Sequence, residues 1–193
     1  MTLLFVDHHD SFVYNLISWF RNKYIGDIIV VQSNNINKID LKSIRGVIFS
    51  PGPGHAKEYP TSLEFLKSLP PNLPFLGVCL GYQMMLHAYG AKLISVSQLP
   101  EHGRQIKICK KINSRLFSPH TLQGYFVLYK SLGVPWDDSV FQKDFRLLAH
   151  ENKISLAAEH VQFPHMGVQF HPESFASTGG DNLLKGFLKL VQK

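Results

Sequence analysis

The stretch "PFLGVCLGYQMML" (residues 74–86) places a cysteine at the junction of two sequence patterns. Apolar residues run almost unbroken up to Cys79, as in a buried strand, and apolar side chains recur at helical spacing after it. Gly77 and Gly81 lie two residues to either side of Cys79. This G-x-C-x-G pattern is the cysteine form of a nucleophile elbow, a sharp strand-to-helix turn. It predicts that the Cys79 side chain is exposed at the tip of that turn.

Two interpretations of Cys79 follow from this pattern. In the first, the amides at the start of the helix favour a thiolate and bind a developing oxyanion, so Cys79 is a nucleophile. In the second, Cys79 is a buried structural cysteine, which is common for a free thiol. Gln83 comes four residues later, one turn along the same helix face, where its amide could reach a bound substrate.

The residues around this junction alternate between strand and helix patterns. Strands are predicted at 2–6, 27–33, 45–49 and 73–78, and helices from Ser11, at 62–69 and at 80–89. Asp10 or Ser11 is predicted to cap the first of these helices. Continuous apolar strands that alternate with helices indicate a parallel sheet covered on both faces.

From about residue 91 the pattern changes to strands with little helix between them, until a final amphipathic helix begins at Asp181. The strand patterns lie at 91–99, 105–111, 124–132, 145–151, 153–160 and 166–171. We therefore expect one α/β domain over residues 1–193, built on an open, mostly parallel sheet sandwiched by helices, with added antiparallel strands.

Two further motifs follow predicted strands. The turn "SPGPG" (50–54) has no side chain beyond Ser50 and its prolines, so it could approach a ligand closely and offer the amides of Gly52 and Gly54. Alone, such a sequence is more often an ordinary tight turn after a strand. Because ligands of open α/β sheets bind beyond the carboxyl ends of the strands, the end of this strand is a candidate site.

The segment "GVQFHPES" (167–174) supplies a base for a thiol nucleophile. His171 and Glu173 are two residues apart, and on an extended segment they would point to the same side. The carboxylate could then hold the imidazole ring, as a catalytic base requires. Alternatively, His171 is a surface histidine beside a helix-capping glutamate.

Composition excludes several function classes. The net charge is +6, but the basic residues are scattered and the densest group, "RQIKICKK" (104–111), alternates with apolar residues like a half-exposed strand. This argues against nucleic-acid binding.

Two cysteines are too few for a disulfide framework, no histidine or cysteine has metal-site spacing, and no apolar run is long enough to span a bilayer. Because the N-terminus lacks the pattern of a signal peptide, we expect a cytoplasmic protein. We also expect a protein that uses no metal and no cofactor.

Taken in order, the "SPGPG" turn, "GVCLG" followed by Gln83, and "FHPES" resemble the class I (triad) glutamine amidotransferases across essentially the whole chain. "DHHDSFVYNL" (7–16) is similar to the opening of the small amidotransferase subunits of anthranilate synthase and aminodeoxychorismate synthase. "EHGR" (101–104) and "YKSL" (129–132) also resemble segments of that group.

The resemblance implies roles for individual residues. Cys79 would be the nucleophile, His171 the general base and acid, and Glu173 the residue that orients the imidazole. The amides of Gly52 and Leu80 would form the oxyanion hole. The groups that bind glutamine would be Gln83, Ser131 and Leu132, together with Pro53 and Gly54 of the turn.

The resemblance further implies a subunit that hydrolyses L-glutamine and delivers ammonia to a larger, chorismate-binding synthase subunit. Lys130 stands where the family usually has histidine, and Tyr82 stands where it often has histidine. "HAKEYP" (55–60) departs from the usual sequence after the turn. Two alternatives remain: a stand-alone thiol hydrolase of the same fold, such as a γ-glutamyl peptidase, and a non-catalytic binding module.

Overall fold

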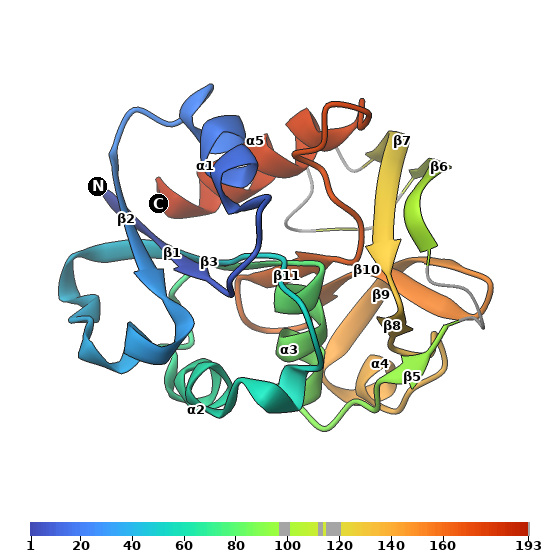
Figure 1. The fold of residues 1–193 in the computed structure, drawn as a ribbon, viewed down its shortest axis with the longest axis horizontal. Helices are drawn as coiled ribbons and strands as arrows, with labels where there is room; N and C mark the ends of the chain where they lie inside the picture. Colours follow the sequence, from blue (N-terminus) through green and yellow to red (C-terminus); the bar gives the residue numbers. More distant parts are fainter. Residues whose placement is uncertain (97–100, 112–113, 115–120, 193) are drawn as a thin grey trace.

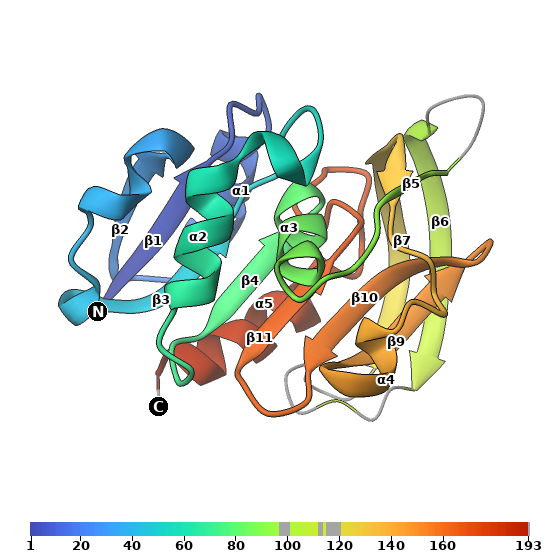
Figure 2. The same cartoon turned by 90° about the horizontal axis from the view of Figure 1, so that it is seen from below.

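The computed structural model describes residues 1–96, 101–111, 114 and 121–192. Within these ranges, seven strands form one sheet in the order β2-β1-β3-β4-β11-β10-β9 (Figures 1 and 2). The strands from β2 to β11 pair in parallel, whereas β10 pairs antiparallel with both β11 and β9. The strands are β1 (Thr2–Asp7), β2 (Asp27–Gln32), β3 (Ile44–Phe49), β4 (Phe75–Val78), β9 (Phe145–Glu151), β10 (Ile154–His160) and β11 (His165–Val168).

Helices cover both faces of this sheet. Figure 1 shows α1 (Val13–Arg21) and α5 (Gly180–Val191) on one face and α2 (Pro60–Ser68) and α3 (Leu80–Ala88) on the other. Strand β1 is buried on both sides because its side chains alternate between two cores. Leu3 and Phe5 pack in the core that contains α1 and α5, and Leu4 and Val6 pack in the core that contains α2 and α3. The shorter helices are η1 (Ser33–Lys38), η2 (Leu41–Ser43), η3 (Ala56–Glu58) and α4 (Val140–Lys143).

The added strands form two small antiparallel sheets beside the main one. β6 (Glu101–Lys111) pairs with β7 (Thr121–Lys130), and β5 (Ile94–Ser95) pairs with β8 (Leu132–Gly133). A mostly parallel sheet between helices, with added antiparallel strands, is the fold class that the sequence predicts. That prediction is confirmed.

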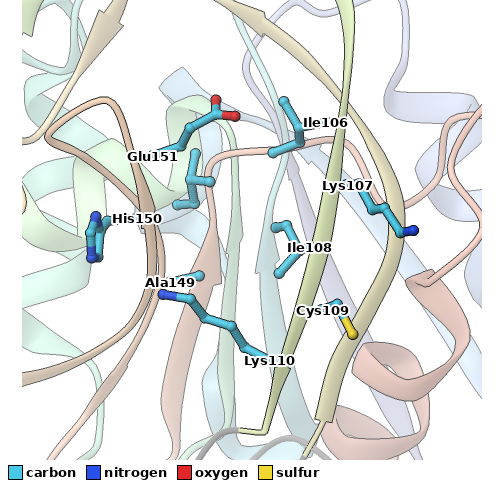
Figure 3. A pocket seen from close by; sticks show the side chains of 9 residues that line it. Ile106, Lys107, Ile108, Cys109, Lys110, Ala149, His150 and Glu151 are labelled. Carbon is cyan, nitrogen blue, oxygen red and sulfur yellow. The ribbon is translucent and has the colours of Figure 1, made fainter.

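Strand β6 has the alternating burial that its sequence predicts. Ile106 and Ile108 are buried, whereas Lys107 and Cys109 are exposed on the opposite side of the strand (Figure 3). The isoleucines face a cavity of about 350 Å³ between β6 and the strands β9 and β10. Both Cys79 and Cys109 have free thiols. Cys109 belongs to the strand that borders this cavity and does not lie near Cys79.

Several predicted boundaries differ from the structure. Helix α1 begins at Val13, and Asp10 accepts a hydrogen bond from the Phe12 amide (2.7 Å) in the turn before it, so neither Asp10 nor Ser11 is its cap. The strand predicted at 91–99 is reduced to Ile94–Ser95 in its described part, and residues 97–99 lie outside the described residues. No helix within the described ranges is long and apolar enough to cross a membrane.

The parallel pairing gathers the candidate motifs at one edge of the sheet. Because β1, β3, β4 and β11 run in the same direction, their carboxyl ends lie side by side. The segments that begin at His8, Ser50, Cys79 and Gln169 leave these ends. Residues as far apart in the sequence as Phe12 and His171 therefore meet at one place.

Candidate active site

A cavity of about 230 Å³ lies at this edge of the sheet. It brings together every residue that the sequence assigns to oxyanion and substrate binding, and it also contains the candidate nucleophile. The lining residues are Gly52, Pro53, Gly54, Cys79, Leu80, Gln83, Tyr129, Lys130, Ser131 and Leu132.

Cys79 occupies a strained turn between β4 and α3. Its backbone has φ 53° and ψ −103°, a conformation that costs a non-glycine residue about 1–3 kcal/mol. The Cys79 amide donates to the Val168 carbonyl (2.8 Å), which fixes the turn to β11. A Cβ on Gly77 would lie 2.5 Å from the Gly81 carbonyl group, so only glycine permits the chain to fold back this tightly.

The Cys79 side chain is buried, with 6% of its surface exposed, although the elbow pattern predicts an exposed side chain. The reason is that the end of β7 and the two residues that follow it (129–132) cover the turn. In its neutral form, the Cys79 thiol donates to the Tyr129 carbonyl (3.6 Å), and its Sγ accepts from the Gln169 side chain (3.7 Å). The thiol therefore faces the cavity from a sheltered position.

His171 and Glu173 form a buried hydrogen-bonded pair. The His171 Nδ1 lies 2.8 Å from the Glu173 Oε1, and because a carboxylate only accepts, Nδ1 is the donor. The segment is a turn after an isolated bridge to Val127, not the extended strand that the sequence suggests. The turn places the carboxylate beside the ring all the same.

The electrostatic environment of His171 favours its protonated form. Burial by itself would lower its pKa, but the negative charges of Cys79 and Glu173 and their hydrogen bonds raise the pKa well above the usual value. The Nε2 of the ring has no partner of good hydrogen-bond geometry among the described residues. The ring thus presents a protonated nitrogen on the side away from Glu173.

Aromatic rings fix the position of this imidazole, and sequence reasoning did not assign them. The ring centroids of Tyr129 and Phe12 lie 5.1 and 5.8 Å from that of His171, both in edge-on contact. Phe12 and Tyr129 also contact each other. Both residues lie within motifs of the resemblance. The contact of Tyr129 with His171 depends on the pairing of β7 with the histidine segment, and that of Phe12 depends on β1 and β11 ending at the same edge of the sheet.

Gln169 is a further residue that sequence reasoning missed. Its side chain is fully buried, its Oε1 accepts from the Gln83 Nε2 (3.1 Å) and its Nε2 donates to the Cys79 sulfur. Gln83 also donates to the Leu132 carbonyl (2.9 Å). The sequence signal was a polar residue at the end of a buried strand, two positions before His171.

The "SPGPG" turn packs tightly on the segment after β1. A Cβ on Gly52 would lie 2.6 Å from a methyl carbon of Leu80 and 2.8 Å from the His8 carbonyl oxygen. Gly54 has φ 75°, which favours glycine. The Tyr59 hydroxyl donates to the Pro53 carbonyl (3.0 Å), so the turn is held from both sides.

His8 contacts the first residue of the same turn, Ser50. Its ring nitrogens lie 3.3 Å from the Ser50 hydroxyl and 3.1 Å from the Ser62 hydroxyl. Burial, together with the neighbouring His9, lowers the pKa of His8 to about 3. The ring is therefore neutral and joins β3 to α2 through hydroxyl groups.

The two side chains that depart from the family pattern lie in different places. Tyr82 is fully buried in the core, where it packs against Gly167, and it does not line the cavity. Lys130 is buried and does line the cavity. Among the described residues, no cluster of three histidine, cysteine or acidic side chains is placed to hold a metal ion.

A family model described as "Glutamine amidotransferase class-I" matches residues 4–191. The chain belongs to this family. Anthranilate synthase component 2 of Cyanidium caldarium is 35% identical over 199 residues, which cover 97% of this chain and 98% of that protein. The chloroplastic anthranilate synthase beta subunit 2 of Oryza sativa subsp. japonica is 32% identical, over 98% of this chain and 71% of that protein.

The fold of this class I amidotransferase also matches solved structures. A Thermoplasma acidophilum protein, described as a candidate subunit of GMP synthase, superposes with a TM-score of 0.81 over 100% of this chain and 94% of its own, at 19% identity. At that identity the match shows the fold alone. The relatives by sequence place this amidotransferase with the anthranilate synthase component II type.

Proposed function

We propose that this chain is the glutaminase subunit of a chorismate-aminating synthase. It hydrolyses L-glutamine to glutamate and supplies ammonia to a larger subunit that binds chorismate. The observation that carries the proposal is the position of Cys79. The thiol occupies a strained elbow, faces a cavity of about 230 Å³, and interacts with a histidine that is hydrogen-bonded to a buried glutamate.

The proposed chemistry begins with attack of the Cys79 thiolate on the side-chain amide carbon of glutamine. The amides of Gly52 and Leu80 donate hydrogen bonds to the oxyanion of the tetrahedral intermediate. In other enzymes, removal of one such donor raises the activation free energy by about 3–4 kcal/mol. His171 donates its Nε2 proton to the departing nitrogen, which leaves as ammonia. The product on the enzyme is a glutamyl thioester.

Hydrolysis of the thioester reverses the proton transfer. His171, now neutral, accepts a proton from water while the water oxygen attacks the thioester carbonyl carbon. Glutamate leaves, and Cys79 returns to the thiolate. Glu173 holds the ring throughout by accepting the Nδ1 hydrogen, as its 2.8 Å distance allows.

The remaining cavity residues are proposed to bind the substrate. Because the Gln83 Nε2 donates to Leu132 and Gln169, its Oε1 is left to accept from an N–H group of glutamine. The backbone of Ser131 and Leu132 and the turn Pro53–Gly54 also line the cavity. The polar lining suits an amino acid better than an apolar ligand.

The partner is inferred from the relatives, whose names are component 2 and beta subunit of anthranilate synthase. Whether the aminated product is anthranilate or aminodeoxychorismate depends on that larger subunit. Co-purification of the chain from native cells, followed by mass spectrometry, would identify it.

The decisive experiment compares two nitrogen sources in the purified complex. Cys79→Ala should abolish glutamine-dependent amination of chorismate and leave ammonia-dependent amination unchanged, because the larger subunit performs amination. Loss of both activities would contradict the proposed division of roles. Robust hydrolysis of γ-glutamyl peptides, rather than of free glutamine, by the isolated chain would instead favour a stand-alone hydrolase.

A further inference from the structure

The buried amide of Gln169 makes a contact with the reacting atom that no assigned role explains. Its Nε2 lies 3.7 Å from the Cys79 Sγ, within hydrogen-bonding range for sulfur. The side chain is fully buried, and the Gln169 backbone amide is anchored to the Leu156 carbonyl (2.9 Å). The side-chain amide is thus held at the sulfur by the backbone of the central sheet.

A chain of hydrogen bonds determines which end of this amide faces the sulfur. The Leu132 carbonyl only accepts, so the group of Gln83 that faces it (2.9 Å) is the NH2 group. The same NH2 group lies 3.1 Å from Gln169, whose carbonyl oxygen must therefore face Gln83. The NH2 group of Gln169 is left to face Cys79.

We propose that Gln169 is a catalytic hydrogen-bond donor that stabilises negative charge on the Cys79 sulfur. A side-chain amide neither gains nor loses a proton at physiological pH. It can therefore donate a hydrogen bond to a thiolate without taking up the proton that His171 holds. Hydrogen bonds to a charged acceptor are roughly twice as strong as neutral ones, and burial strengthens them. The sulfur then has two stabilising neighbours, Gln169 and the imidazolium.

The same chain links the thiol to the substrate pocket. Gln83 and Leu132 line the cavity, and Gln83 is hydrogen-bonded to Gln169. Substrate contacts that move the Gln83 amide would therefore also move the Gln169 amide and change its hydrogen bond to the sulfur. This inference rests on the proposed role of Cys79 as nucleophile, but thiol reactivity can be measured without glutamine.

The test is the pH dependence of alkylation by iodoacetamide, followed at Cys79 and Cys109 by peptide mass spectrometry. Gln169→Met keeps the length of the side chain but removes the donor, and Gln169→Glu places a carboxylate at the sulfur. Both substitutions should move the pH midpoint of Cys79 alkylation upward by at least about one pH unit. The rate of Cys79 alkylation at neutral pH should then fall about tenfold. Cys109, exposed and distant, is the internal reference and should not change.

Gln162→Met, at an exposed glutamine away from the cavity, is the matched control and should leave both cysteines unchanged. Circular dichroism checks that each variant folds, and Gln169→Glu decides the matter if Gln169→Met does not fold. An unchanged midpoint for Cys79 in a folded Gln169 variant would overturn the role of Gln169. If glutamine hydrolysis is absent while the midpoint still moves, the proposed function fails and the Gln169 contact stands.

Discussion

The Nδ1 of His171 donates to the Oε1 of Glu173 over 2.8 Å, and both side chains are almost completely buried. This pair fixes the tautomer of the imidazole, so that Nε2 is the nitrogen available to the Cys79 side. Against the effect of burial, the charge of Cys79 and then that of Glu173 raise the pKa of His171. The pair therefore controls both the direction and the protonation of the base.

Glu173→Gln should lower the kcat of glutamine hydrolysis by roughly 100-fold or more, because loss of the orienting carboxylate has a large effect in related triads. The alkaline limb of the activity profile should also move to lower pH, since the His171 pKa loses one of the charges that raise it. Steady-state kinetics across pH would show both effects. Glu64→Gln, at an exposed position of α2, is the control, and equal kinetics for the two variants would contradict the role of Glu173.

Acid should destabilise the fold through two buried histidines. Burial lowers the pKa of His8 to about 3 and that of His165 to about 4, whereas an unfolded histidine titrates near 6.5. Below pH 6.5 the unfolded chain therefore binds protons that the folded chain excludes, and the free energy of unfolding falls. Each histidine contributes a slope of up to about 1.4 kcal/mol per pH unit.

Urea unfolding at pH values between 7.5 and 4.5 would measure this slope. His171 acts in the opposite sense, because its raised pKa adds stability that is lost as the pH rises. Burial also lowers the pKa of His55, so this histidine adds to the acid effect of His8 and His165. His8→Asn should reduce the slope by about one histidine's share. The exposed His150→Asn serves as the comparison, and a slope that is the same in both variants would argue against a buried neutral His8.

Gly52→Ala should impair catalysis more than stability alone explains. Its Cβ would lie 2.8 Å from the His8 carbonyl oxygen, so the turn must shift and carry the Gly52 amide away from the cavity. We expect a fall in kcat of roughly 100-fold, the effect of losing one oxyanion donor. Gly26→Ala creates a similar backbone clash far from the cavity, 2.4 Å from the Met1 carbonyl oxygen. It should lower the thermal midpoint but keep kcat, and an equal loss of kcat in both variants would count against the turn as an oxyanion donor.

The sequence was sufficient for those features that depend on local patterns. The apolar run before Cys79 and the helical spacing after it predict the strand, the helix and the elbow between them. Likewise, residues that follow the carboxyl ends of parallel strands are expected at one edge of the sheet, and "SPGPG", Cys79 and His171 lie there.

The features that sequence reasoning missed depend on contacts between distant segments. Cys79 is buried because the end of β7 covers the elbow, and no local pattern predicts that contact. Tyr82 points into the core because Gly167 on the neighbouring strand leaves room for its ring. Gln169 reaches the sulfur only because β11 lies next to β4.

The central claim is that Cys79 is the nucleophile, and the chain contains a built-in comparison because Cys109 is its only other cysteine. The most direct measurement is covalent labelling by an electrophilic glutamine analogue, read residue by residue with peptide mass spectrometry. The account predicts one adduct per chain, on Cys79, which excess glutamine prevents and His171→Ala slows. Labelling of Cys109, or labelling of Cys79 that glutamine does not reduce, would contradict it.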